Sequence, residues 1–274
     1  MVTVVLTHDV DWFSVKSLRG LRTFFGFVRR ELSGGKLSAL KVPYWQNFHK
    51  WMELENGYDV RSVFYFLYKG VGGSTYNFSD VEDAVKNLDK GGWEIGLHGT
   101  FDSTRSLSNL TEEKMLLERT LGKSVQGIRL HYLRISEESL RLQEEAGFRY
   151  DSSLETQEFF KIFHPVVRNR KLNLIELPLT LHDSTLFVKK KMAFDDAYKY
   201  SRKIIDKASR EDGIVTLNWH QRTFSSEFKS WLKTYVLILK YAKSIEAEML
   251  KPIEVVQRFQ QNATELTDFL KLER

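Results

Sequence analysis

The chain has 274 residues, of which 42% are hydrophobic and 28% are charged, and its formal net charge is +5. A chain of this length buries a large core, so we expect a single domain over residues 1–274 rather than two small ones. The chain has no cysteine, which excludes disulfides, thiolate metal ligands and a cysteine nucleophile. His, Asp and Glu are therefore the side chains that can bind a metal.

No stretch of the sequence approaches the roughly 20 apolar residues of a membrane span, and residues 1–10 lack the basic start of a secretory signal. We therefore expect a cytoplasmic protein without a transmembrane segment. The basic runs at 168–171 and 189–191 lack the interleaved aromatic residues of single-strand binding sites, so we expect no nucleic-acid partner. We interpret these runs as solvated surface; attraction to phosphate, to an anionic glycan or to a membrane surface is the alternative.

Predicted strands and helices alternate along the chain. Continuous apolar, β-branched runs predict buried strands at 2–7, 61–67, 93–98, 125–131, 174–180 and 213–219. Periodic apolar residues and capping residues predict helices at 78–92, 110–122, 136–147, 193–211 and 228–243, and one more after Pro252. We expect a helical insertion at about 13–57 and C-terminal helices at about 226–274. This alternation predicts the α/β class, as a parallel barrel or an open sheet.

Two carboxylates lie at the end of the first predicted strand. Asp9 and Asp11 stand in THDVDW, residues 7–12, and positions two apart on an extended chain face the same side. In an α/β barrel the carboxyl ends of the strands converge on one face, so we expect this side to be the mouth of the barrel. Two carboxylates this close do not both stay ionised cheaply without a cation, so one can bind metal while the other holds or takes a proton. An Asp-rich turn is the alternative, and we interpret the neighbouring His8 as structural.

A histidine and an aspartate end the third predicted strand. His98 and Asp102 are four residues apart in IGLHGTFDS, so they share a face if a helical turn begins there. Imidazole and carboxylate are a common ligand set for Zn²⁺ and similar ions. Together with Asp11 they predict a three-ligand site with open positions for water and substrate. The alternative is that Asp102 caps the next segment.

The order of these motifs resembles that of the polysaccharide deacetylases of carbohydrate esterase family four, which share the nodulation-protein-B-like homology domain on a distorted (β/α)7 barrel. The resemblance spans residues 3–221. By this likeness THDVDW supplies Asp9 as the catalytic base and Asp11 as a metal ligand. GLHGTFD resembles the second motif, usually His-Ser/Thr-x-x-His, and implies His98 and Asp102 as the other ligands.

Asp102 stands where the family has its second histidine. The implied cofactor is one divalent metal ion. Zn²⁺ is the first choice, but the additional carboxylate makes Mn²⁺, Co²⁺ or Fe²⁺ credible beside it.

The segment RLHY, residues 129–132, resembles the third motif, with His131 where proline is usual. The resemblance implies that Arg129 orients the base and that the backbone of Tyr132 stabilises the oxyanion. YDSSL resembles the fourth motif and implies that Asp151 holds Arg129. A buried structural ion pair between Arg129 and Asp151 is the alternative.

LNWH, residues 217–220, resembles the fifth motif. It implies His220 as the general acid and Leu217 and Trp219 as walls of an acetyl pocket. The alternatives are a core histidine and core packing of the tryptophan.

Further polar residues lie on predicted loops and can contact substrate. His164 and Arg168 stand in HPVVRNRK, and His182 and Asp183 stand in LHDSTL. We name His131, His164 and His182 as substrate-binding candidates, although polar residues are also ordinary in surface loops.

The sequence therefore predicts a metal-dependent hydrolase that removes an acetyl group from an N-acetylated sugar or glycan in surface polysaccharide metabolism. The expected partner is a carbohydrate, and peripheral membrane contact is an open alternative. Two other functions stay open: a non-sugar C–N amidohydrolase of the same fold, and a non-catalytic glycan-binding barrel.

Overall fold

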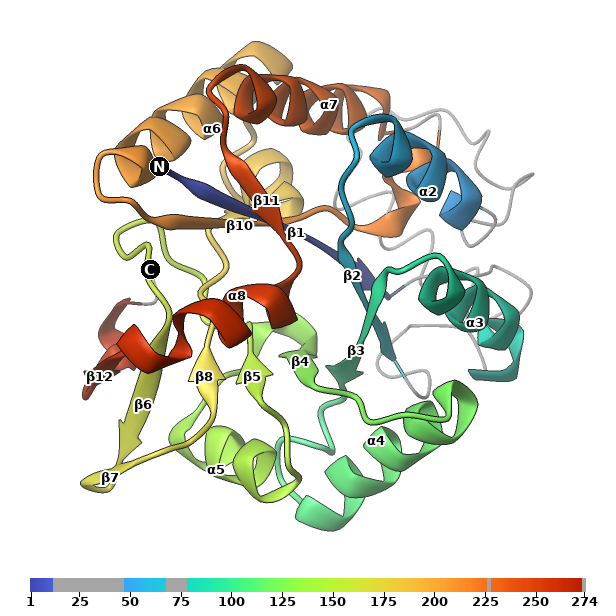
Figure 1. Ribbon diagram of the computed structural model, residues 1–274, viewed down its shortest axis with the longest axis vertical. Helices are drawn as coiled ribbons and strands as arrows, with labels where there is room; N and C mark the ends of the chain where they lie inside the picture. The colour runs from blue at the N-terminus through green and yellow to red at the C-terminus, as the bar shows by residue number, and fades with distance from the viewer. Residues whose placement is uncertain (12–46, 68–77, 226–227, 273–274) are drawn as a thin grey trace.

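A curled sheet of mostly parallel strands forms the centre of the protein (Figure 1). The computed structural model describes residues 1–11, 47–67, 78–225 and 228–272. Hydrogen-bonded strands follow one another in the order β12-β6-β8-β5-β4-β3-β2-β1-β10-β9. The strands that build the barrel are β1 (Thr3–Val10), β2 (Val63–Leu67), β3 (Glu94–Gly99), β4 (Gly127–Leu130), β5 (Tyr150–Asp151), β8 (Ile175–Glu176), β9 (Leu181–His182) and β10 (Ile214–Asn218).

The stretch that holds β8 and β9 closes the ring of strands. Its first part pairs with β5 and its last part pairs with β10, both in parallel. Between the two, Leu179 N donates to the carbonyl of Leu154 at 2.8 Å. Pro178, which has no N–H to donate, interrupts the stretch. The order β1, β2, β3, β4, β5, β8–β9, β10 confirms the prediction of a distorted (β/α)7 barrel.

Short strands extend this sheet. β6 (Phe163–Val167) pairs antiparallel with β7 (Arg170–Lys171) and with β8, and in parallel with β12 (Thr264–Leu266). β11 (Glu248–Leu250) pairs with the start of β1. The sequence pattern predicted none of these four strands, because runs of two to five residues are too short for a period of two to stand out.

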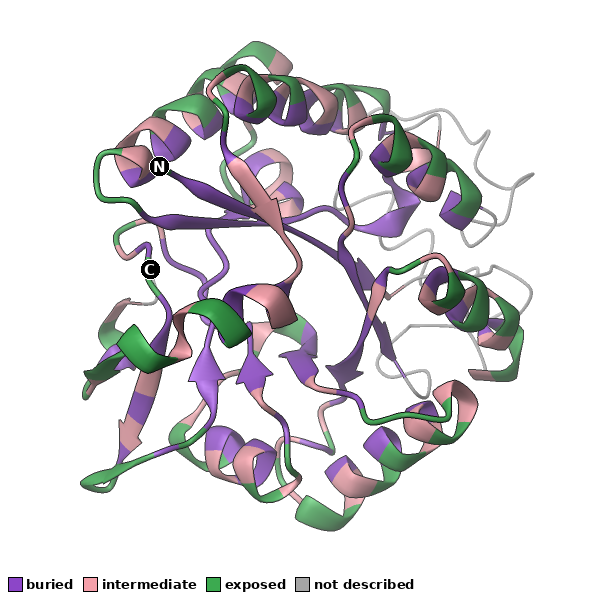
Figure 2. Ribbon diagram, in the orientation of Figure 1, coloured by how far each residue is buried: buried purple, intermediate pink, exposed green. Residues whose placement is uncertain are grey.

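Helices surround the barrel, with buried faces toward the sheet and exposed faces outward (Figure 2). They are α2 (Phe48–Gly57), α3 (Glu82–Lys90), α4 (Leu107–Leu121), α5 (Glu137–Glu145), α6 (Phe194–Ser209) and α7 (Lys229–Ser244). None of the helices in the described ranges is long and apolar enough to cross a membrane.

A last helix, α8 (Pro252–Phe259), covers the end of the barrel where the strands begin. Its Val255 and Val256 pack with the interior residues Val5, Tyr65 and Tyr150. The bottom of the barrel is therefore filled by side chains, and the opposite, carboxyl end of the strands is left for a functional site.

Two helix starts differ from the prediction. α4 begins at Leu107 and not at residue 110, because the side chain of Ser106 caps it by accepting from Asn109 N at 3.4 Å. α3 begins at Glu82 after a 3₁₀ turn, without a side-chain cap. Most of the predicted insertion at 13–57 lies outside the described residues.

Candidate metal and catalytic site

A cavity of about 230 Å³ opens at the carboxyl ends of the strands. Loops and strand ends far apart in the sequence supply its walls. The described residues that line it are Asp9, Asp11, His98, His131, Tyr132, Leu133, His182, Ser184, Val188, Lys189, His220 and Arg222. Of the predicted site residues, the structure therefore brings seven together here: Asp9, Asp11, His98, His131, Tyr132, His182 and His220.

The alternation of side chains along each strand explains this convergence. Three strand ends carry polar residues two positions apart, in the segments Asp-Val-Asp (9–11), Arg-Leu-His (129–131) and Asn-Trp-His (218–220). Alternate residues of a strand face the same side, so both polar members of each segment point into the barrel. The intervening Val10, Leu130 and Trp219 belong to the hydrophobic core outside it. The polar residues thus form a lower layer and an upper layer nearer the cavity.

Three side chains of the upper part can hold a metal ion together. The ligand atoms of Asp11, His98 and His131 all lie within 4.8 Å of one another. Asp11 Oδ1 is 2.9 Å from His98 Nε2 and 3.5 Å from His131 Nδ1. Burial disfavours the charge on Asp11, but His131, His220 and His98 outweigh it and hold the pKa of Asp11 well below its usual range.

The hydrogen bonds of this group fit a cation. Nδ1 of His98 donates to the carbonyl of Arg129 at 2.9 Å, so Nε2 carries the lone pair of the neutral ring. That lone pair faces Asp11 Oδ1, and the Nε2 atom itself lies 3.1 Å from Nδ1 of His131. Oδ1 of Asp11 is buried and accepts no hydrogen bond from the described part of the chain. Hydrogen-bond acceptor atoms of these three side chains therefore face one another. This arrangement is stable when a cation lies between the atoms or when some of them are protonated.

Asp102 does not join this group of ligand atoms. It is exposed, and its carbonyl accepts from Arg105 N at 3.2 Å in the turn that precedes α4. His131, predicted as a substrate contact, has a ligand atom in the position expected of Asp102 and could hold a metal ion with Asp11 and His98. The reason is the register of β3 and β4: His98 pairs with Arg129, and His131 lies two residues further along the same face.

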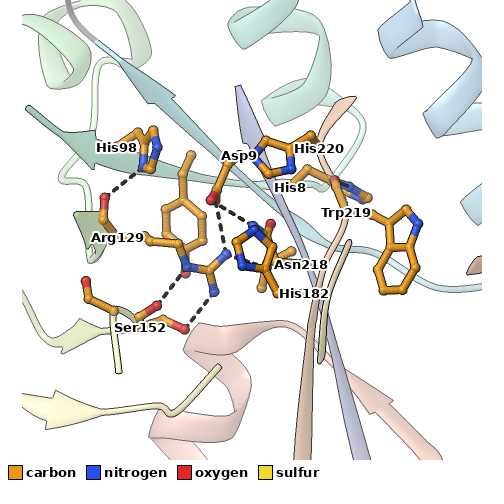
Figure 3. Close-up of polar contacts among 12 residues, drawn as sticks. His8, Asp9, His98, Arg129, Ser152, His182, Asn218, Trp219 and His220 are labelled. Atoms are coloured by element: carbon orange, nitrogen blue, oxygen red, sulfur yellow. Dashed lines mark hydrogen bonds and ion pairs between the residues drawn. The ribbon is translucent and has the colours of Figure 1, made fainter. Parts of the chain in front are cut away.

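Asp9 lies in the lower layer, 4% exposed, with donors on both oxygens. Arg129 donates to Oδ1 at 3.0 Å and Asn218 donates to Oδ2 at 2.7 Å (Figure 3). Burial disfavours its ionised form, but Arg129, His98 and His220 outweigh it and lower the pKa of Asp9. Asp9 is therefore ionised and can accept a proton at the floor of the cavity.

Arg129 is held by residues other than the predicted Asp151. It donates to the carbonyl of Ser152 at 2.7 Å, to the hydroxyl of Ser152 at 2.8 Å and to Thr7 Oγ1 at 2.6 Å. Asp151 instead accepts from Ser153 Oγ at 2.6 Å and lies beside Glu176. Burial raises the pKa of Asp151 to about 6, and burial together with Asp151 raises that of Glu176 well above its usual range. The two buried carboxyls therefore share a proton.

His220 lies between two carboxylates. Nδ1 donates to Asp183 Oδ1 at 2.7 Å, and Nε2 is 3.2 Å from Asp11 Oδ2. Burial and Arg222 lower its pKa, but Asp183 and Asp11 outweigh them and raise the pKa of His220 to about 10. The hydrogen bond to Asp183 fixes the ring so that Nε2 presents a proton to the cavity.

Asp183 is a candidate functional residue that sequence reasoning undervalued. It is fully buried, and its Oδ2 also accepts from the backbone N–H of His220 at 2.9 Å. The sequence held a signal, since Asp183 follows the predicted strand 174–180 by three residues, as Asp9 follows the predicted strand 2–7 by two. Arg222 and Lys189, which line the cavity, had no such signal.

Three predicted substrate contacts lie away from the cavity lining. Trp219 is fully buried, and its Nε1 donates to the carbonyl of Trp231 on α7, so the ring points away from the site (Figure 3). Leu217 has the same strand parity and also packs in the outer core. His164 lies on β6, where Nδ1 contacts the carbonyl of Leu172 at 2.8 Å.

Tyr132 stands at the rim of the cavity and is 64% exposed. Its φ of 59° and that of Leu133, 54°, place two successive residues in the left-handed region. Such strain persists only where surrounding structure fixes it, and it is typical of functional sites.

Comparisons with known proteins identify the fold. No family model and no curated protein matches the chain. Among solved structures, the chain is similar to a putative polysaccharide deacetylase from Mycobacterium smegmatis, with 17% identity, a TM-score of 0.69 and coverage of 97% of this chain and 93% of that one. It is similar to Puue allantoinase, with 15% identity, a TM-score of 0.68 and coverage of 95% and 90%. A pseudoenzyme of carbohydrate esterase family four from Bacillus anthracis has 10% identity, a TM-score of 0.53 and coverage of 96% and 66%. The protein thus has the polysaccharide deacetylase fold.

Proposed function

We propose that the protein is a metal-dependent hydrolase that removes an acetyl group from an N-acetylated sugar or glycan. One observation carries this proposal. A ligand group of Asp11, His98 and His131 shares a small cavity with a carboxylate base, Asp9, and a proton donor, His220.

The three ligands suit one divalent ion. Two imidazoles and one carboxylate form a common catalytic zinc set, so Zn²⁺ is the first candidate, with Mn²⁺, Co²⁺ and Fe²⁺ as alternatives. When bound, such an ion polarises a carbonyl and acidifies a water molecule.

The residues around this ion divide the proton transfers. Asp9, kept ionised by Arg129 and Asn218, takes the proton of the attacking water. His220, kept protonated by Asp183, donates its Nε2 proton to the leaving nitrogen. We assign the oxyanion contact to the backbone N–H of Tyr132, whose conformation is fixed at the cavity rim.

An acetate-release assay on N-acetylglucosamine and its oligomers, with the purified protein loaded with Zn²⁺, tests the proposal. We expect release that stops on treatment with a chelator and returns when metal is added back. His220→Asn and Asp9→Asn, which keep the size of each side chain, serve as inactive controls. Full release by either variant would refute the assigned chemistry.

A second candidate is hydrolysis of a non-sugar C–N bond, and the likeness to Puue allantoinase favours it. The same base, acid and metal ligands would serve an amide of either origin. Metal-dependent turnover of a cyclic or linear ureide, without turnover of any acetylated sugar, would favour this candidate.

A non-catalytic role is the third candidate, because a pseudoenzyme shares this fold. The presence of base, acid and ligands in one cavity argues against it here. The cytoplasmic location and the link to surface polysaccharide metabolism stay predictions of the sequence.

A further inference from the structure

Basic side chains beside the proposed catalytic group have no role in the acetyl chemistry. Lys189 ends the π-helical turn Thr185–Lys189, His182 ends β9 and Arg222 lies in the 3₁₀ turn Gln221–Phe224. All three line the cavity. The lysine belongs to the run 189–191, whose neighbouring members do not line it.

The charge balance of the cavity leaves a positive surface. Asp9 and Asp11 are the carboxylates among the described lining residues. Arg129 neutralises Asp9 at 3.0 Å, and a divalent ion would neutralise Asp11. Arg222 lies 3.9 Å from Asp11 Oδ2, and Lys189 pairs with Glu155 outside the lining, so a bound divalent ion would add positive charge beside both side chains.

Lys189 is available to a ligand. Its ammonium lies 3.1 Å from Glu155 Oε2, but the lysine side chain is 63% exposed while Glu155 is buried. Because the lysine side chain is exposed, its ammonium can contact a ligand anion while it stays paired with the buried Glu155. The ion pair with Glu155 keeps the lysine side chain at the rim of the cavity.

His182 supplies an independent observation. Both of its ring nitrogens are buried and make no hydrogen bond within the described ranges of the chain. The nearest carboxylate oxygens are 3.7 Å and 3.8 Å away, on Asp183 and Glu155. Its ring stacks on that of His220 at 5.5 Å, which places it next to the proton donor. Two buried ring nitrogens whose carboxylate neighbours lie beyond hydrogen-bond distance indicate a ligand that supplies a hydrogen bond.

We propose that His182, Lys189 and Arg222 bind an anionic group, a carboxylate or a phosphate, carried by the acetylated substrate. The inference rests on the proposed function and adds the chemical class of the substrate to it. The acetyl group lies at Asp11 and His220, and the anionic substituent lies toward His182 and Lys189. A neutral sugar offers Lys189 and His182 no anion and binds more weakly.

Calorimetric titration of the whole Zn²⁺-loaded protein tests this inference. The probes are N-acetylglucosamine, N-acetylglucosamine 6-phosphate and N-acetylmuramic acid, which carry no charge, a phosphate and a carboxylate. We expect at least one anionic probe to bind roughly tenfold more tightly than the neutral sugar, since a hydrogen bond to a charged group has about this effect. The preferred probe tells phosphate from carboxylate.

Adjacent lysines provide a matched control. Lys189→Met should remove most of the preference for the anionic probe, and His182→Leu should reduce it. Lys190→Met should not change it, because Lys190 lies over the Tyr200 ring, 5.3 Å from its centroid, and does not line the cavity. If the metal alone held the anion, none of the three substitutions would change the affinity for the anionic probe.

Equal affinity for charged and neutral probes, no binding of any probe, or equal effects of Lys189→Met and Lys190→Met would overturn the inference. The acetate-release assay separates this result from the proposed function. Equal release from charged and neutral sugars refutes the anionic class alone. Lysine-dependent anion binding without acetate release refutes the deacetylase proposal and leaves the anion site standing.

Discussion

The identity of the third metal ligand can be tested with one pair of substitutions. His131→Ala removes a side chain that is 8% exposed and whose Nδ1 lies 3.1 Å from Nε2 of His98. Asp102→Ala removes an exposed side chain outside the ligand group. Loss of a residue that only supports a metal ligand lowers affinity by 10- to 100-fold, so loss of a direct ligand should cost at least about 100-fold, or about 2.7 kcal/mol.

Competitive titration with a chromophoric chelator measures both dissociation constants. We expect a rise of at least about 100-fold for His131→Ala, similar to that for His98→Ala. For Asp102→Ala we expect a change below about threefold, within the effect of an ordinary surface substitution. Circular dichroism of the metal-free variants controls for folding. The opposite order, with Asp102→Ala losing the metal and His131→Ala keeping it, would refute the geometric argument from the strand register.

Four further substitutions test the proton-transfer residues and the buried carboxyls. Asp9→Asn should keep stoichiometric metal by elemental analysis but lower kcat by roughly 10²–10⁴-fold, because it removes only the base. Asp183→Asn removes a group that raises the pKa of His220, so the alkaline limb of the kcat profile, where the acid loses its proton, should move to lower pH; an unmoved limb would exclude His220 as the acid. Glu55→Leu should lower the free energy of unfolding by about 3–5 kcal/mol in urea titrations, because this buried carboxylate accepts from four buried groups, among them a histidine at 2.8 Å. The free energy of unfolding should also fall as pH rises from about 4 to 6. Asp151 has a pKa of about 6 in the folded protein and 3.8 in the unfolded chain, so the folded state holds a proton that the unfolded state releases. Asp151→Asn should flatten this pH dependence.

Long, strongly apolar strands made the barrel predictable from sequence. All eight residues of β1 are buried, and the apolar, β-branched run at 2–7 is typical of a central parallel strand. The closing stretch was harder, because it was predicted as one strand at 174–180 and is two short ones around Pro178. A strand of two residues depends on its neighbours for its geometry, and no local pattern specifies it.

Motif spacing predicted the residues that gather at the cavity better than it predicted their partners. Asp11 and His98 lie together, whereas Asp102 was chosen by its distance of four residues along the chain. That spacing brings side chains together only on a helix, and the turn after β3 does not continue as one there. The pairing of β3 with β4 is what brings His131, and not Asp102, next to His98. Strand pairing is a tertiary property, so the spacing of residues within one motif does not predict it.

Strand parity would have recovered part of this information. Asp9 and Asp11, Arg129 and His131, and Asn218 and His220 all share the same alternation, while Leu217 and Trp219 have the opposite one. Once His220 is placed inside the barrel, the alternation of side chains places Trp219 on the opposite side, toward the helices. The same reasoning places His8 outside the barrel, where it contacts Glu55 at 2.8 Å.

The two layers also separate the tasks of the site. The lower layer sets charge, because Arg129 and Asn218 hold Asp9 ionised beneath the cavity. The upper layer presents reactive atoms, with Asp11, His131 and His220 one side-chain step closer to the opening. A shift of β10 by one residue would replace Asn218 and His220 in the barrel by Leu217 and Trp219, so the proposed acid and the Asn218 donor to Asp9 would be lost together. The site is thus specified by strand register as much as by residue type, which is why substitutions in the outward-facing core should affect activity only when they move a strand.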